Sequence, residues 1–516
     1  MSSPARPGTV YLVGAGPGDP GLITCRGLEI LRTADVIVYD RLAPSELLLE
    51  ARPEARLHYV GKSAGRHALK QEDINALLAE AALAGHSVCR LKGGDPFLFG
   101  RGGEEADYLR QRGVIFEVVP GVTSALAAPA YAGIPVTDRR HASLVSIATG
   151  HAQAGEQSPD WRSLAGQRGT LVVLMGMSNL AKLVQELLAG GRAADTPAAV
   201  VHWGATNRQV AVYSDLSHIA GEVVRQGIGA PAVLVVGEAV ALGERLAWFR
   251  PGPLRGLRVL VTRPRHQASS FARQLRQAGA EPVVCSVIRT EPIAVSSERL
   301  RECLARPWHW VLFTSANGVT AFRDCLLAAQ LDWRALAGAR LAAIGPGTAA
   351  ELTRAGLRVD FTPSRAVADS LAAELPSVAA GTDILLPRAA EARDALPEGL
   401  RARGASVEVL RVYRTLPDSA GLALLRAALE EGVDVVTFTS SSGVRALLGA
   451  VAKAALRGIA VASIGPITSE AARASGLRVA IEATEHTIPG LVAAIEDYAS
   501  RRPQRERPSE GGDADA

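Results

Sequence analysis

The stretch TVYLVGAGPGDPGLITCRGLEILRTA, residues 9–34, contains an apolar run, a glycine-rich turn and a run with helical spacing of its apolar residues. The first run is rich in β-branched residues and predicts a buried strand, and the last predicts a helix. A strand, a turn and a helix in this order are typical of open α/β sheets, which bind ligands beyond the carboxyl ends of their strands. The stretch therefore predicts an α/β fold with a ligand-binding loop over residues 14–24.

The glycine-rich turn lies where a dinucleotide-binding fingerprint, G-x-G-x-x-G, normally occurs. Gly14 and Gly16 match it, and Asp40 follows at a distance suited to a ribose contact. The third glycine position is Asp19, whose side chain would obstruct the approach of helix to strand and whose charge opposes a pyrophosphate. Pro17 also removes a backbone N–H that would cradle phosphate. Dinucleotide binding is therefore kept only as an alternative.

The bulk composition limits the classes of function. A chain of 516 residues is too long for one core and predicts at least two domains. The net charge of +4 is spread without a basic block and aromatic residues make up 4% of the chain, so no nucleic-acid partner is expected. No apolar run of membrane-spanning length occurs, which predicts no membrane association and a cytoplasmic location. Five cysteines without a CxxC pair predict neither a disulfide framework nor a metal site.

The second half of the chain repeats itself after a candidate boundary at AWFRPGPLRG, residues 247–256. VLFTSANGVTAF aligns with VVTFTSSSGVRALL, and LAAIGPGTAAELTRAGLRV aligns with AVASIGPITSEAARASGLRV. Each copy alternates apolar β-branched runs with helical runs, which is typical of a parallel sheet covered by helices on both faces. The repeat predicts two similar α/β lobes in this half.

Eight motifs follow one another across residues 14–209: GAGPGDPGLIT, VYDRL, GKSAG, RLKGGDPFLFGRGGEE, PGVTSA, AGIPVTDR, LMGM and TPAAVVHWGATNRQ. Together they resemble the uroporphyrinogen-III C-methyltransferases of the tetrapyrrole methylase family. RLKGGDPFLFGRGGEE is the most specific, whereas GAGPGD alone is shared with relatives such as diphthine synthase. The resemblance implies the two-lobed α/β fold of class III methyltransferases, with S-adenosylmethionine bound in the cleft. It also implies a homodimer formed through this half.

The same resemblance assigns roles to individual residues. Asp40 is implied to be the proton acceptor and Lys62 the proton donor, while Arg101, Glu104 and Arg139 are implied to contact the substrate. The residues implied to line the S-adenosylmethionine site are Pro17, Gly93, Gly94, Asp95, Leu98, Thr123, Ser124, Met175 and Gly204.

These residue types suit the implied chemistry, in which a pyrrole carbon displaces the methyl group of a sulfonium. A carboxylate that takes the pyrrole N–H proton makes the ring carbon more nucleophilic, and arginine forks suit the substrate's carboxylates. Local alternatives remain: Asp40 capping a turn, Lys62 as a solvated charge and Met175 as core filler. The family usually has T-H-R where this chain has Asp138 before Arg139, so Asp138 is expected to weaken or reshape anion binding there.

Residues 257–495 resemble uroporphyrinogen-III synthase in VTRP, FTSANGV, AAIGPGTA, LLPRAAEARDAL, VYRT and FTSSSGV. The implied fold has two flavodoxin-like lobes joined by crossings near residues 287–293 and 412–417. Tyr413 in the second crossing is expected to donate a hydrogen bond into the cleft, with packing of the hinge as the alternative.

Small polar residues follow the predicted strands of both lobes, at positions where helices open. Hydroxyls and free N–H groups at helix N-termini receive anions, so these residues are expected to bind substrate carboxylates. The alternative is that they are ordinary helix caps. The residues are Thr314, Ser315, Thr439 and Ser440.

The sequence thus predicts a methyltransferase over residues 1–250, a synthase over residues 255–500 and a disordered tail over residues 501–516. The predicted activity is conversion of hydroxymethylbilane to uroporphyrinogen III, followed by two methylations to precorrin-2. Two alternatives stay open: a non-catalytic tetrapyrrole-binding or sensing module in the second half, and a different methylase substrate in the first. Whether precorrin-2 serves sirohaem, cobalamin or another modified haem is not determined by the sequence.

Overall fold

The computed structural model describes residues 4–52, 54–61, 70–150, 159–263, 265–392 and 394–501. The described residues contain four five-stranded sheets. They divide into two compact units, the first formed by Met1–Val287 with Ser419–Ala516 and the second by Ile288–Asp418. Lys62 and the predicted tail from residue 502 lie outside the described residues.

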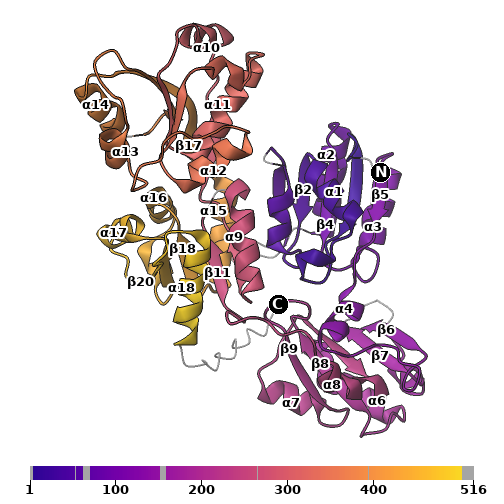
Figure 1. Ribbon diagram of the computed structural model, residues 1–516. Helices are drawn as coiled ribbons and strands as arrows, with labels where there is room; N and C mark the ends of the chain where they lie inside the picture. The colour runs from indigo at the N-terminus through magenta and orange to yellow at the C-terminus, as the bar shows by residue number, and fades with distance from the viewer. Residues whose placement is uncertain are drawn as a thin grey trace. The chain divides into compact units, whose positions relative to one another are not determined.

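The first lobe of the first unit is a parallel sheet with helices against it (Figure 1). Its strands are β1 (Thr9–Gly14), β2 (Val36–Tyr39), β3 (Arg56–Tyr59), β4 (Val88–Lys92) and β5 (Ile115–Val119), and its helices are η1 (Pro20–Leu22), α1 (Cys25–Thr33), η2 (Ser45–Glu50), α2 (Gln71–Leu83) and α3 (Gly102–Gln111). The strand order is β3-β2-β4-β1-β5. β1, β2 and β4 are buried along their whole length, so none of them shows the alternation of apolar and polar residues that is typical of a half-exposed strand.

The second lobe has a mixed sheet in the order β6-β7-β10-β8-β9, in which β10 runs antiparallel to both of its neighbours. Its strands are β6 (Val145–Thr149), β7 (Thr170–Leu174), β8 (Pro197–His202), β9 (Val210–Asp215) and β10 (Ala232–Val236), and its helices are α4 (Ser124–Tyr131), α5 (Trp161–Ala165), η3 (Met177–Asn179), α6 (Leu180–Ala189), α7 (Ile219–Arg225), η4 (Glu238–Leu242) and α8 (Gly243–Leu246). The short connection between β8 and β9 makes them antiparallel neighbours, and it carries residues of the cleft described below.

The third lobe of the first unit is fully parallel, in the order β12-β11-β18-β19-β20. Its strands are β11 (Arg258–Val261), β12 (Glu281–Val284), β18 (Val435–Phe438), β19 (Ala460–Ser463) and β20 (Val479–Glu482), and its helices are α9 (Arg265–Gln277), α15 (Ser419–Glu430), α16 (Ser441–Ala450), η6 (Lys453–Leu456), α17 (Pro466–Ala474) and α18 (Ile488–Ser500). Numbered along the chain, this order is 2-1-3-4-5, the flavodoxin-like arrangement.

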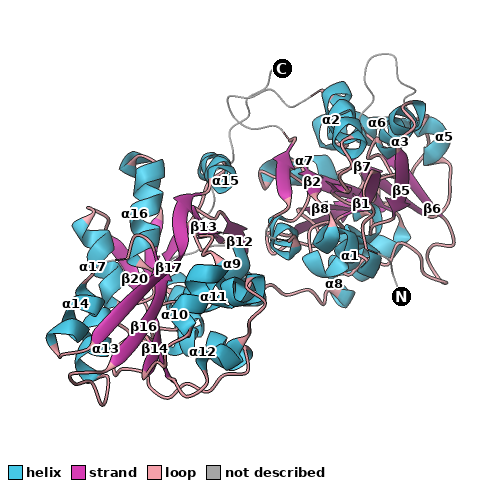
Figure 2. Ribbon diagram, turned by 90° about the horizontal axis from the view of Figure 1, so that it is seen from above, coloured by secondary structure: helices cyan, strands magenta, loops and turns pink. Residues whose placement is uncertain are grey.

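The second unit contains the other copy of the repeat (Figure 2). Its strands are β13 (Ile288–Pro292), β14 (Trp310–Phe313), β15 (Arg340–Ala343), β16 (Asp383–Ala389) and β17 (Ser406–Pro417), and its helices are α10 (Ser297–Leu304), α11 (Ala316–Ala328), η5 (Trp333–Leu336), α12 (Pro346–Arg354), α13 (Ala368–Glu374) and α14 (Ala395–Ala402). The sheet order is β13-β17-β16-β14-β15. The pair β16–β17 corresponds to β11–β12, and β14–β15 corresponds to β18–β19, so both lobes have the same core topology although their strands enter in a different chain order.

The two expected crossings are strands paired with each other. Ile288 lies opposite Pro417 and Thr290 opposite Thr415 in the antiparallel pairing of β13 with the end of β17. The division between the compact units falls directly beside them, at Val287 and Asp418. Backbone pairing fixes these segments, because each strand supplies the other's ladder hydrogen bonds.

The segment expected to be a boundary is anchored to the second lobe. The rings of Trp248 and Phe249 each lie 4.9 Å from that of Tyr131, centroid to centroid, and the Trp248 indole donates to the Ala130 carbonyl at 2.9 Å. Such aromatic contacts add to the burial of the rings, so this segment is fixed at its first residues rather than being a free linker. No described helix is long and apolar enough to cross a membrane.

The cysteines give a first test of this packing. Burial raises the pKa of Cys89 and of Cys285 to about 12, whereas Cys25 at the start of α1 is exposed. At pH 8 we expect a thiol reagent to modify Cys25 in the folded protein, and Cys89 and Cys285 only after unfolding, because the thiolate is the reacting form. Mass spectrometry of the labelled peptides measures this, and rapid labelling of Cys89 in the folded protein would contradict the described core. The Cys25→Ser variant is the control that removes the fast phase.

The same thiols predict the direction of a pH effect on stability. Above about pH 8.5 an unfolded chain releases thiol protons that the folded chain retains. Stability contributed by the buried neutral thiols is therefore present below that pH and declines as the pH rises toward 12.

Candidate active site

A cleft of about 3700 Å³ lies in the first unit beyond the carboxyl ends of β1, β2 and β4. The volume exceeds the roughly 300–1,000 Å³ of a typical small-molecule pocket because the same space is also lined by residues of the third lobe, such as Leu424 and Ala455. It is lined by Asp40 and by all nine residues predicted to form the cofactor site, namely Pro17, Gly93, Gly94, Asp95, Leu98, Thr123, Ser124, Met175 and Gly204.

The floor of the cleft is formed by loops in direct backbone contact. The Gly94 N–H donates to the Gly16 carbonyl at 2.7 Å. A Cβ atom on Gly121 would lie 2.4 Å from the Gly94 oxygen and 2.6 Å from the Gly14 Cα. No side chain fits at such distances, so glycine is required where these loops meet. The KGGDP turn is therefore held against the ends of both β1 and β5.

Asp95 organises this floor. One carboxylate oxygen, Oδ1, accepts from the Phe97 and Leu98 N–H groups at 2.8 and 3.1 Å, and Oδ2 accepts from the Gly121 N–H at 3.0 Å. The carboxylate thereby ties the KGGDP turn to the loop after β5. Asp95 lines the cleft as predicted, and its hydrogen bonds hold the shape of that loop.

The walls combine unusual backbone with exposed apolar side chains. Phe99, Met175 and Trp203, which line the cleft, have left-handed φ values of 52°, 54° and 48°. Non-glycine residues in this region carry strain that concentrates at functional sites. Met175 is 49% exposed and lines the cleft, as do Leu42 and Phe99, so the alternative that Met175 is core filler does not hold.

Asp40 lies directly after β2, beside the glycines of the KGGDP turn. Its Oδ1 accepts from the Leu42 N–H at 3.1 Å, and its Oδ2 lies 3.2 Å from Arg90 Nη2. A Cβ atom on Gly93 would lie 2.5 Å from the Leu42 Cβ, which shows how closely the two loops approach. Asp40 thus caps a turn, as the alternative proposed, and also presents a carboxylate to the cleft.

A buried charge cluster, formed by Arg90, Lys92, Glu105 and Asp40, lies beneath this wall. Glu105 Oε1 accepts from Lys92 Nζ at 2.9 Å and from Arg90 Nε at 3.2 Å. Burial lowers the pKa of Lys92. Arg90, Lys92 and Glu105 were not singled out from the sequence. The available signal was two cations inside the otherwise apolar strand VCRLK, where charged residues are seldom buried without partners.

Two residues predicted to contact substrate pair with each other instead of lining the cleft. Arg101 Nη2 lies 2.7 Å from Glu104 Oε2, and Arg101 Nε donates to Glu104 Oε1 at 2.8 Å. These hydrogen bonds from Arg101 hold the pKa of Glu104 below its usual range. Arg101 has a left-handed φ of 57° at the start of α3.

Arg139 is exposed and also does not line the cleft. The neighbouring Asp138 accepts from the Arg140 N–H at 2.9 Å, and its Oδ1 lies 2.6 Å from His141 Nδ1. The contact with His141 lowers the pKa of Asp138 to about 2. The Asp138 carboxylate, which stands where the family usually has histidine, therefore bonds to residues of its own turn.

Asp19, at the third fingerprint position, is held by two hydrogen bonds. Its Oδ1 accepts from the Gly21 N–H at 2.8 Å, and its Oδ2 accepts from the Tyr131 hydroxyl at 2.7 Å. The second bond joins the loop after β1 to α4 of the other lobe. A carboxylate fixed here opposes a pyrophosphate, which argues against the dinucleotide alternative.

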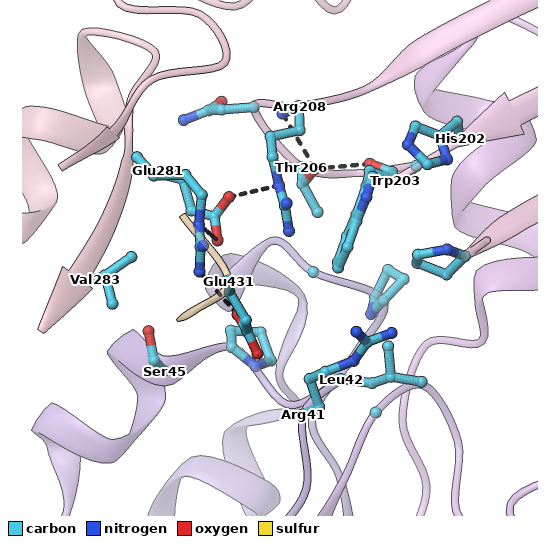
Figure 3. Close-up of a pocket in the computed structure, with 18 of the residues that line it drawn as sticks. Arg41, Leu42, Ser45, His202, Trp203, Thr206, Arg208, Glu281, Val283 and Glu431 are labelled. Atoms are coloured by element: carbon cyan, nitrogen blue, oxygen red, sulfur yellow. Dashed lines mark hydrogen bonds and ion pairs between the residues drawn. The ribbon is translucent and has the colours of Figure 1, made fainter. Parts of the chain in front are cut away.

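The loop that carries Gly204 also contacts the third lobe (Figure 3). Asn207, 8% exposed, donates from Nδ2 to the carbonyls of Ala280 at 2.7 Å and Arg276 at 3.1 Å. The Arg208 guanidinium lies 3.6 Å from the Trp203 ring centroid, and its Nε lies 2.5 Å from Glu281 Oε2. The cleft wall therefore includes residues of both halves of the sequence.

We expect Asn207→Ala to lower the free energy of unfolding by about 1–3 kcal/mol, because two buried carbonyls lose their donor. Denaturant titration followed by tryptophan fluorescence measures this. The control is Asn179→Ala, because the Asn179 side chain donates only one 3.4 Å hydrogen bond at the surface, to the Gly150 carbonyl. Identical midpoints for the two variants would contradict the contact with the third lobe.

In the second half of the sequence, Ser315 and Ser440 cap helices with nearly identical geometry. Their φ values are −164° and −163°, and their hydroxyls accept from the N–H groups of Gly318 and Gly443 at 3.0 and 3.2 Å. Both hydroxyls therefore act as helix caps, as the alternative in the sequence analysis states. Thr314 and Thr439, directly before them, are half-buried.

Tyr413 lies within the apolar core of the second unit. Its side chain is 7% exposed, and its hydroxyl lies 2.9 Å from Ser315 Oγ. Burial raises the pKa of Tyr413. These contacts correspond to the packing alternative, with the hydroxyl directed at the opening of α11.

Family models match both halves of the chain. A model of tetrapyrrole (corrin/porphyrin) methylases matches residues 9–220, and a model of uroporphyrinogen-III synthase HemD matches residues 269–493. The matches coincide with the two resemblances that the sequence motifs indicated.

Individual relatives extend this finding. The porphyrin biosynthesis protein HemD of Ruminiclostridium josui is 39% identical over 94% of this chain and 97% of that protein. A uroporphyrinogen-III C-methyltransferase of Bacillus subtilis is 46% identical over 47% of this chain and 95% of that protein. A crystal structure of uroporphyrin-III C-methyltransferase from Thermus thermophilus, complexed with S-adenyl homocysteine, is 42% identical and covers 45% of this chain and 99% of that one, with a TM-score of 0.40.

Proposed function

Because the chain belongs to the tetrapyrrole methylases in its first half and to the uroporphyrinogen-III synthases in its second, we propose that it makes precorrin-2 from hydroxymethylbilane. The second half closes the linear tetrapyrrole to uroporphyrinogen III, and the first half methylates that product twice. The observation that carries the proposal is the cleft at the strand ends, which contains Asp40 and all nine residues of the expected cofactor site.

The residues of the cleft fit S-adenosylmethionine. Gly93 and Gly94 line the cleft without side chains, and Leu42, Phe99 and Met175 offer exposed apolar surface. When bound, the co-substrate supplies an electrophilic methyl group on a sulfonium. Thr123 and Ser124 open α4 at this wall, with the Thr123 hydroxyl already engaged by the Ala125 N–H at 3.2 Å.

Asp40 is the proposed proton acceptor. Asp40 lines the cleft from the end of β2, and its Oδ1 accepts from the Leu42 N–H at 3.1 Å. Removing the pyrrole N–H proton raises the nucleophilicity of the ring carbon as it attacks the methyl group. Lys62, the proposed donor, lies outside the described residues.

The second half requires no nucleophile for its proposed reaction. Hydroxymethylbilane loses hydroxide readily, so the protein mainly has to hold a flexible chain in the geometry that inverts the last ring. Thr314 and Ser315 in one unit, and Thr439 and Ser440 in the other, stand at helix openings where backbone N–H groups receive carboxylates. We also propose that the protein works in the cytoplasm as a homodimer formed through the methylase half, which light scattering coupled to size exclusion would test.

Tyr413→Phe separates packing from catalysis in this half. We expect the free energy of unfolding of the second unit to fall by about 1 kcal/mol, because one buried hydrogen bond to Ser315 is lost. Formation of the type III isomer should be retained. A fall of tenfold or more in that rate, without a change in stability, would contradict this expectation and assign Tyr413 to catalysis.

The decisive experiment supplies purified protein with hydroxymethylbilane, with and without S-adenosylmethionine, and separates the oxidised products by chromatography. We expect type III uroporphyrin without the methyl donor and a dimethylated product with it. If only the type I isomer forms, the second half is not a working synthase and the alternative of a binding or sensing module takes its place. If type III forms but is never methylated, the first half acts on another substrate.

A further inference from the structure

Arg90 is the central member of the buried charge cluster, and the proposed chemistry gives it no part. Its side chain is 4% exposed in β4. Nε donates to Glu105 Oε1 at 3.2 Å and Nη1 donates to the Leu91 carbonyl at 3.2 Å, while Nη2 forms an ion pair with Asp40 Oδ2 at 3.2 Å. A planar group with three such partners has one orientation.

Glu105 anchors the guanidinium through its Nε. It is fully buried, and its Oε1 also accepts from Lys92 Nζ at 2.9 Å and from Gln71 Nε2 at 3.2 Å. The cluster contains two cations and two carboxylates, so its formal charges balance. Such pairing is what allows charges to remain ionised at this depth, whereas removal of one member leaves an uncompensated buried charge.

The consequence falls on Asp40. Its Oδ1 is fixed by the Leu42 N–H and its Oδ2 by Arg90, so the plane of the carboxylate is set by two contacts from different elements. A base that takes a proton from a bound ring has to lie in line with that N–H, and a displacement of about 1 Å costs about 100-fold in rate.

We propose that Arg90, anchored by Glu105, is a positioning residue for methyl transfer that holds the Asp40 carboxylate toward the substrate. The inference rests on the proposed function of the methylase half. Arg90 acts through Asp40 and is not among the residues that line the cleft.

A double-mutant cycle on the full-length protein tests this, with Arg90→Lys, Asp40→Asn and both together. Lysine keeps the charge but does not reproduce three fixed donors. With Asp40 present, we expect Arg90→Lys to lower kcat for methylation of uroporphyrinogen III by about 10–100-fold, with KM and the affinity for S-adenosylhomocysteine changed less than about threefold. In the Asp40→Asn background the same substitution should change kcat less than about twofold, because residues that act as a unit are not additive.

Arg26→Lys is the matched control. Arg26 lies in the same lobe and pairs with two carboxylates, Glu117 at 3.0 Å and Glu29 at 3.1 Å, away from the cleft. We expect it to leave methylation unchanged. Formation of the type III isomer is measured on the same preparation and shows whether the second half of the chain is folded.

If the fold-losses in kcat of Arg90→Lys and Asp40→Asn multiply in the double variant, the proposal is overturned. Multiplying losses would mean that Arg90 acts independently of Asp40, as a purely structural residue does. An unchanged kcat in Arg90→Lys would also overturn it. If Arg90→Lys fails to bind S-adenosylhomocysteine, the cycle is run with Glu105→Gln, which keeps the guanidinium and removes the negative charge that pairs with it, and the same additivity criterion applies. A wild-type protein that does not methylate uroporphyrinogen III would refute the proposed function instead, so the two failures are distinguishable.

Discussion

Asp40→Asn is expected to lower methyl transfer to uroporphyrinogen III about 10²–10⁴-fold, the range that a positioned general base contributes. Asparagine keeps an oxygen for the Leu42 N–H, which donates to Asp40 Oδ1 at 3.1 Å, so the turn after β2 should persist. What is lost is the group that takes the pyrrole proton, and with it the charge that faces Arg90 Nη2 at 3.2 Å. The affinity for S-adenosylhomocysteine should change little, because Asp40 is not among the residues proposed to hold it.

The measurement is single-turnover methylation with radiolabelled methyl donor, alongside type III isomer formation by the same preparation. The isomer yield should equal that of the wild type. Asp107→Asn is the matched control, since Asp107 is an exposed residue of α3 that accepts only from the Gln111 side chain at 2.7 Å. Methylation by Asp40→Asn at the rate of this control would remove Asp40 from the mechanism.

Gly121→Ala is expected to have the second large effect, on both stability and methylation. The added Cβ would lie 2.4 Å from the Gly94 oxygen and 2.6 Å from the Gly14 Cα, and neither atom belongs to a side chain that can rotate away. Forcing backbone apart in a packed region costs about 1–3 kcal/mol or more. Because the displaced loop is the KGGDP turn, methyl transfer should fall by about 100-fold.

Chemical denaturation and calorimetric titration of S-adenosylhomocysteine measure these two losses. Gly221→Ala is the control, because Gly221 lies in α7 with no atom within 4 Å of an added Cβ, and alanine there should stabilise the helix by about 0.5–1 kcal/mol. If both variants gained stability equally, the described contact between the strand ends would be wrong.

The repeat in the second half shows which features of the fold local sequence patterns predict and which they do not. Matching stretches such as FTSANGV and FTSSSGV predicted two similar lobes, and Ser315 and Ser440 do cap their helices with nearly the same backbone angles. The pairing of β13 with the end of β17 was not evident from periodicity, because antiparallel partners such as Glu291 and Arg414, 123 residues apart, carry no local signal. The same holds for the direction of β10 in the second lobe.

The candidate site likewise contains residues whose place the local motifs predicted and residues whose contacts they did not predict. Gly93, Gly94 and Asp95 of the KGGDP turn line the cleft, as do Thr123 and Ser124 at the opening of α4. Arg101, directly before α3, and Glu104 in the first turn of α3 pair with each other, a local contact that forms without a shared ligand. Whether such a pair opens toward a bound substrate depends on neighbours that the motif does not contain.

Residue order alone determined the α/β class, the two-part plan and ten of the residues that line the cleft, because glycine turns, strand runs and ordered motifs are properties of neighbours along the chain. The tertiary structure decided what Asp40 and Glu105 do with Arg90, and that Asn207 bonds to carbonyls of the third lobe. These contacts join residues 15 to 73 positions apart. They exist only because strand order brings the segments together and burial makes an unpaired charge or amide costly, which is a condition of the folded molecule and not of any one segment.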